Sequence, residues 1–182
     1  MLDEWQEQYI RLIAAADPEL GITFPLARLI LIFSSLDIFA ASNTHDGRST
    51  CKAFKSWVDR YVDIGRIGCT ASDLWGARCG ILYTLRPDSD HSRAKKARTI
   101  FYTWGNKNTF LPSLNNAIDF VETYDQRGRV AISVDVLHSA VREGLCKYFD
   151  ELDLNPSEKQ KVGSRAFGFT SKFDEQVLKP FS

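Results

Sequence analysis

The chain has 182 residues, of which 44% are hydrophobic and 25% are charged, and its 23 basic residues balance its 23 acidic ones. This length predicts a single domain whose core is large enough to fold without disulfides or metal ions. The zero net charge excludes a general electrostatic attraction to nucleic acid or membrane, so a site for a polyanion would have to be a local patch. The acidic start, MLDEWQEQYI, is unlike a secretory signal, and the four cysteines form no CxxC pair. We therefore expect a cytoplasmic protein with free thiols.

The first half of the chain has helical periodicity. The predicted helices span residues 2–16, 22–42, about 50–62 and 73–85, with caps expected at Ser49 or Thr50 and at Ser72 and with loops at 42–47 and 65–70. The second of these helices reaches membrane-spanning length. Its internal Arg28 and Asp37 favour a buried core helix over a membrane span, because charges are costly inside a bilayer.

The second half of the chain has two strand-like segments, RTIFYTW (98–104) and GRVAISV (128–134), which we expect to pair. Residues 119–125 predict a short helix, Asp135 is expected to open a long one, and the tail from Gly163 is expected to be irregular. The fold class is therefore mostly α, an up-and-down helical bundle with a small two-stranded β addition. We expect one domain over 1–182, with the bundle in 1–90 and the basic loop, strand pair and C-terminal helices in 91–182.

The sequence has few motifs that bind metals or cofactors. The three histidines, His45, His91 and His138, are scattered and have no ligand partner at metal-binding spacing. The glycines fit neither the GxxxxGK[ST] nor the GxGxxG pattern. We therefore expect no metal and no cofactor. A small-molecule enzyme that uses His91 or His138 would have no supporting motif.

Two charged residues lie inside apolar helices. Asp37 is a lone carboxylate in LILIFSSLDIFAA, and Arg78 is surrounded by apolar residues in DLWGARCGIL. Buried charges are normally paired, so we expect an Asp37–Arg78 contact between packed helices. Such a pair can be purely structural or can belong to a functional site.

Three segments within residues 20–90 form a recognisable series: LILIFSSLDIFAAS, FKSWVDRYV and SDLWGARCGILYTL. Together they resemble the HEPN superfamily, whose members are helical bundles that often cleave RNA in defence and toxin–antitoxin systems. The family motif is R-x4-6-H, and a dimer joins two copies in one cleft. The resemblance implies that Arg78 holds phosphate and that Asp37 orients Arg78. It also implies that the protein is a homodimer that binds RNA and a cognate inhibitor protein.

The chain departs from this motif at the histidine. Tyr83 occupies the position at the shortest spacing from Arg78, and a tyrosine with its usual pKa near 10 is a poor general base at pH 7. A literal R-x4-H occurs from Arg86 to His91, but Pro87 interrupts it. The same segment is basic and predicts either a solvated loop or a phosphate track formed by Arg86, His91, Arg93, Lys95, Lys96 and Arg98.

Two functions therefore remain open. The first is a HEPN-like protein of a toxin or antiviral-defence context that cleaves or binds RNA in a dimeric cleft, as a metal-independent endoribonuclease if it is catalytic. In that reading the catalytic residues are Asp37, Arg78 and Tyr83. The alternative is a catalytically degraded, non-enzymatic dimeric protein-interaction module, which Tyr83 in place of histidine favours.

Overall fold

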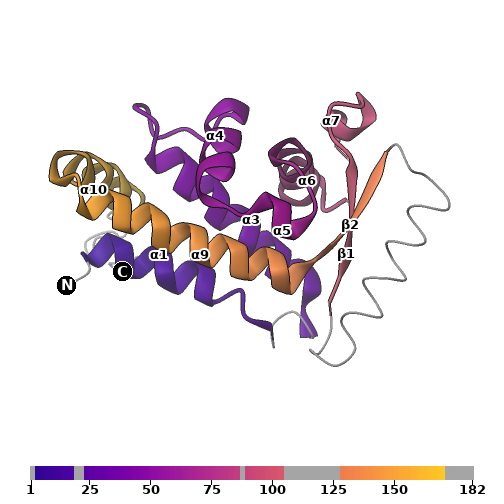
Figure 1. The fold of residues 1–182 in the computed structure, drawn as a ribbon, viewed down its shortest axis with the longest axis horizontal. Helices are drawn as coiled ribbons and strands as arrows, with labels where there is room; N and C mark the ends of the chain where they lie inside the picture. Colours follow the sequence, from indigo (N-terminus) through magenta and orange to yellow (C-terminus); the bar gives the residue numbers. More distant parts are fainter. Residues whose placement is uncertain (1–2, 19–22, 87–88, 105–127, 171–182) are drawn as a thin grey trace, which may run out of the picture.

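The computed structural model describes residues 3–18, 23–86, 89–104 and 128–170. The described helices are α1 (Glu4–Ala14), α3 (Pro25–Ser42), α4 (Cys51–Tyr61), α5 (Ile64–Ile67), α6 (Ala71–Thr84), α7 (Asp90–Arg93), α9 (Val134–Asp153) and α10 (Pro156–Thr170). The strands are β1 (Thr99–Thr103) and β2 (Arg129–Ser133). The expected class, mostly α with a small two-stranded addition, is confirmed (Figure 1).

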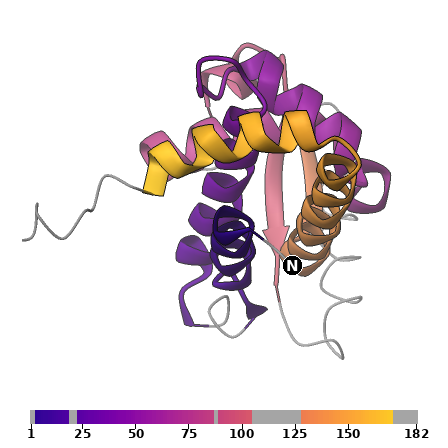
Figure 2. The same cartoon turned by 90° about the vertical axis from the view of Figure 1, so that its left-hand side faces the viewer.

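Helices α3 and α9 form the centre of the core. Helix α3 contacts α1, α4, α6 and α9, and α9 also contacts α4, α5 and α10 (Figures 1 and 2). Aromatic rings join these helices: Phe39 of α3 lies 5.4 Å from Trp57 of α4, and Trp57 lies 6.0 Å from Tyr148 of α9, measured between ring centroids. The second half of the chain therefore contributes to the same core as the first.

The two strands pair in parallel, with Thr99 opposite Arg129 and Thr103 opposite Ser133. Strand β2 runs directly into α9, because the Ser133 hydroxyl accepts a hydrogen bond from the Val136 amide at 3.2 Å and so caps the helix. The expected opening residue, Asp135, instead lies inside the first turn.

The helix caps decide where the other helices begin. Thr50, one of the two expected caps, accepts a hydrogen bond from the Ala53 amide at 3.1 Å. The cap of α6 is Thr70 and not Ser72, because Thr70 and Asp73 satisfy each other's backbone amides in a capping box. The single turn α5 overlaps the loop expected at 65–70.

The expectation of an irregular tail from Gly163 is wrong, because α10 continues to Thr170. Its sequence has little apolar patterning, yet Val162 and Ala166 are fully buried. A Cβ at Gly163 would lie 2.8 Å from Nε1 of Trp5, so the glycine permits close packing on α1. Tertiary packing stabilises this helix. The helix expected at 119–125 lies outside the described residues.

Among the described residues, Pro25–Ser42 is the one helix long and apolar enough to cross a membrane. However, 56% of it is buried inside the fold, as in the core helix of a soluble protein.

Candidate functional site

The predicted contact between Asp37 and Arg78 is confirmed. Arg78 lies in the middle of α6 and donates from both Nε and Nη2 to Oδ2 of Asp37 on α3, with an Nε–Oδ2 distance of 2.8 Å. The second carboxylate oxygen accepts a hydrogen bond from the Ser49 hydroxyl at 2.7 Å. The side chains are only 8% and 17% exposed, so this ion pair is largely shielded from solvent.

Two aromatic rings contact the guanidinium of Arg78. Its central carbon lies 4.9 Å from the ring centroid of Trp75 and 4.7 Å from that of Tyr83, both within cation–π distance. Trp75 is partly buried, whereas Tyr83 is 71% exposed. We call Asp37, Ser49, Trp75, Arg78 and Tyr83 the Arg78 cluster.

The environment of the cluster keeps Arg78 charged. Burial alone lowers its pKa, but the hydrogen bonds that Arg78 makes with Asp37 and Tyr83 outweigh burial, and the net shift of the pKa is upward. For the neighbouring Cys79, burial is the main cause of a raised thiol pKa. Cys79 is therefore a protonated thiol at neutral pH and not an activated nucleophile.

The cluster contains no histidine, and His91 packs elsewhere. His91 belongs to α7, which lies beside α6 near Gly76: a Cβ built on Gly76 would be 3.8 Å from that of His91. Gly76 and Arg78 are two residues apart, which places them about 200° apart around a helix. Arg86 follows the end of α6 and is separated from His91 by Pro87. The histidine of the literal R-x4-H match, His91, is therefore not part of the Arg78 cluster.

The other basic residues of the expected phosphate track lie in or near α7 in the sequence. Arg98 makes two side-chain hydrogen bonds and one backbone hydrogen bond to the buried Asp73, at 2.6–3.1 Å, and Arg93 pairs with Asp90. These two arginines have structural partners. The other basic residues of the expected track, Arg86, Lys95 and Lys96, are exposed.

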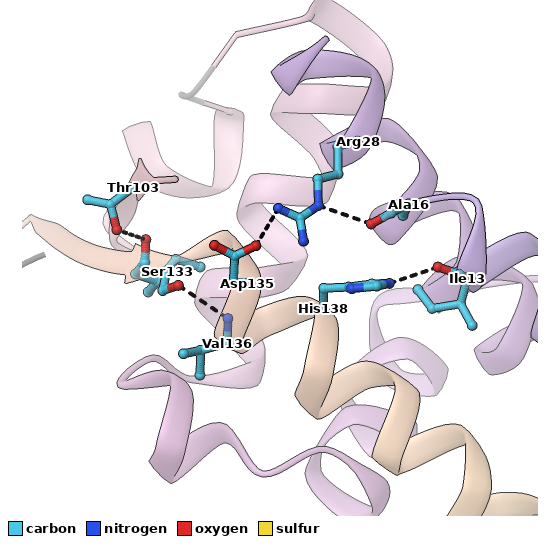
Figure 3. A network of polar contacts seen from close by, with 9 residues as sticks. Ile13, Ala16, Arg28, Thr103, Ser133, Asp135, Val136 and His138 are labelled. Carbon is cyan, nitrogen blue, oxygen red and sulfur yellow. Dashed lines mark hydrogen bonds and ion pairs between the residues drawn. The ribbon is translucent and has the colours of Figure 1, made fainter. Parts of the chain in front are cut away.

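A second polar network fastens α1 and α3 to the start of α9 (Figure 3). Arg28 is 1% exposed and donates to Asp135 at 2.6 Å and to the Ala16 carbonyl at 3.0 Å. Nε2 of His138 lies 2.8 Å from the Ile13 carbonyl and donates to it. Burial, the largest effect, lowers the pKa of His138. This network holds α1, α3 and α9 together.

Sequence reasoning identified Asp37, Arg78 and Tyr83 but missed two members of the cluster. The sequence indicates Ser49 only as a helix cap, although its hydroxyl donates to Asp37. It indicates Trp75 only as an apolar neighbour of Arg78. Its spacing of three residues from Arg78, which places both on one helix face, was the available signal.

Within the described residues, no group of three or more His, Cys, Asp or Glu side chains is placed to hold a metal ion. No protein-family model matches this chain, and neither a curated protein nor a solved structure does.

Proposed function

We propose that this chain is a HEPN-like cytoplasmic protein that binds RNA at the Arg78 cluster of a homodimer, in a toxin or antiviral-defence context. The observation that carries the proposal is an arginine that is held by a carboxylate and contacts two rings, one of them largely exposed. A fixed guanidinium suits phosphate, and an exposed ring suits base stacking.

The contacts of Arg78 engage its donor groups unequally. Nε and Nη2 are engaged by Asp37, whereas Nη1 lies 4.0 Å from the Cys79 sulfur, a weak acceptor. The ring of Tyr83 lies over this guanidinium. A base stacked on Tyr83 would therefore place the RNA strand beside Arg78.

The chemistry of the cluster supports binding better than cleavage. Acid–base catalysis on a 2′-hydroxyl at neutral pH needs a group with a pKa near 7, and a phenol is ordinarily far from that value. We therefore propose that the wild-type protein binds RNA without cutting it. Tyr83→His supplies the missing base, and we expect metal-independent cleavage from that variant.

A second candidate, a non-catalytic dimerisation module, is favoured by a different observation. Tyr83 and Leu85, at the end of α6, are 71% and 58% exposed. Adjacent exposed apolar side chains are typical of a protein interface. In this alternative the same surface binds a second copy or an inhibitor protein.

Fluorescence anisotropy with a labelled single-stranded RNA separates the candidates. We expect Tyr83→Phe to bind like wild type and Tyr83→Ala to bind about tenfold more weakly, because stacking on one ring contributes ~1–3 kcal/mol. Leu154→Ala is the matched control, since Leu154 is 87% exposed and distant in sequence from α6. A wild-type dimer by light scattering that binds no RNA would favour the interaction module. RNA cleavage by the wild-type protein would contradict the binding-only proposal.

A further inference from the structure

The outer face of α4 is hollowed on both sides of Lys52. One open depression of about 690 Å³ is lined by Cys51, Lys52, Lys55, Ser56, Asp59 and Arg60. A second, of about 280 Å³, extends toward the turn after α3 and is lined by Ala40, Asn43, Thr44, Thr50, Lys52, Ala53 and Ser56. Lys52 and Ser56 line both, so the two hollows adjoin each other along α4. We call the two hollows together the α4 groove.

The charge at the start of α4 is unfavourable for the folded protein alone. The first turn of α4 contains Lys52 and no acidic residue, although the N-terminus of a helix carries partial positive charge. Arg60, at the other end, is paired with Glu151. An anion in the groove would relieve the repulsion between Lys52 and the helix end.

The groove adjoins the Arg78 cluster. Phe54 of α4 packs on Trp75 with 5.3 Å between ring centroids, and Lys55 donates to the Ser72 hydroxyl on α6 at 3.4 Å. Ser49, which binds Asp37, directly precedes the cap of α4. By contrast, α6 lies between α4 and α7, so the basic loop is on the far side of α6 (Figure 1).

We propose that the α4 groove binds the sugar–phosphate backbone of the RNA strand whose base stacks on Tyr83, with Lys52 and Lys55 contacting phosphates. The hydroxyl and amide side chains of the groove, such as Ser56 and Asn43, suit phosphate and sugar contacts. This inference rests on the proposed function. It replaces the basic loop by α4 as the phosphate track.

Two matched charge reversals test the proposal. Lys52→Glu/Lys55→Glu and Lys95→Glu/Lys96→Glu change the net charge equally, on α4 and on the basic loop respectively. RNA affinity of the full chain is measured by anisotropy over a range of salt concentrations. We expect the α4 variant to bind at least tenfold more weakly, with a salt slope lower by about 1.4, because each phosphate contact on a single strand contributes ~0.7. We expect the loop variant to change less than about threefold at physiological salt, because screening limits long-range effects.

Folding is checked by melting temperature. We expect Lys52→Glu alone to raise it by about 1–3 °C, because an acid replaces a base at the helix N-terminus. The RNA affinity of Lys52→Glu alone is measured as well, and weaker binding by this more stable variant cannot be an effect of unfolding. RNA binding that Tyr83→Ala weakens and the α4 reversal leaves intact would overturn this inference alone. A wild-type protein that binds no RNA would overturn both proposals, and stronger loss in the loop variant would return the track to the basic loop.

Discussion

The Asp37–Arg78 pair should show strong energetic coupling. The test is a double-mutant cycle with Asp37→Asn, Arg78→Met and the combined variant. Arg78→Met keeps much of the packing between the rings of Trp75 and Tyr83 but removes the charge. Asp37→Asn keeps an oxygen that can accept from Ser49 but removes the carboxylate.

The magnitude follows from the geometry of the pair. Arg78 makes two hydrogen bonds to Asp37, and hydrogen bonds to charged groups contribute about 1.5–3 kcal/mol each. The side chains of Arg78 and Asp37 are only 8% and 17% exposed, so solvent screening removes little of this interaction energy. We expect each single variant to lower the free energy of unfolding by about 3 kcal/mol, since breaking a buried pair leaves an uncompensated charge. The double variant should lose about 2 kcal/mol less than the sum of the two.

Urea unfolding at pH 7, followed by circular dichroism, measures all four proteins. The m-values should agree, which shows that the unfolded states are comparable. A coupling energy below about 0.5 kcal/mol would match an exposed surface pair and would refute the shielded geometry on which the Arg78 cluster depends.

Two further predictions concern the rest of the fold. Gly144→Ala should lower the free energy of unfolding by about 1–3 kcal/mol in urea titrations, because the new Cβ would lie 2.9 Å from the Tyr61 carbonyl oxygen. In the control Gly65→Ala the new Cβ would make only an ordinary contact. An equal loss of unfolding free energy in both variants would contradict this packing. Burial lowers the pKa of His138, so below about pH 6.5 the unfolded chain takes up a proton that the folded chain does not. Stability should therefore fall with decreasing pH, by at most about 1.4 kcal/mol per pH unit, and His138→Gln should reduce the slope; an unchanged slope would exclude His138 as its source.

The helices and the ion pair were predictable because their signals are local or chemically strict. Apolar spacing defined α1 and α4, a long apolar run defined α3, and a charge inside an apolar helix requires a partner. With Asp37 and Arg78 as two such charges on neighbouring helices, their contact followed from the sequence.

The remaining features depend on tertiary contacts. Helix α10 has a weak pattern, and its order comes from packing on α1, where Gly163 lies against Trp5. The partner of Arg98 could not be inferred either. Asp73 lies 25 residues earlier in the chain, and the turn that includes α7 brings the two residues together. Without those contacts, Arg98 looks like a free phosphate ligand.

The most direct test of the proposed site is ultraviolet crosslinking of wild-type protein to RNA that contains 4-thiouridine, followed by mass spectrometry of the crosslinked peptides. A base stacked on an exposed ring crosslinks to that residue. We predict a crosslink at Tyr83 that excess unlabelled RNA removes by competition. Crosslinks confined to peptides that contain neither Tyr83 nor residues of α4 would contradict RNA binding at the Arg78 cluster.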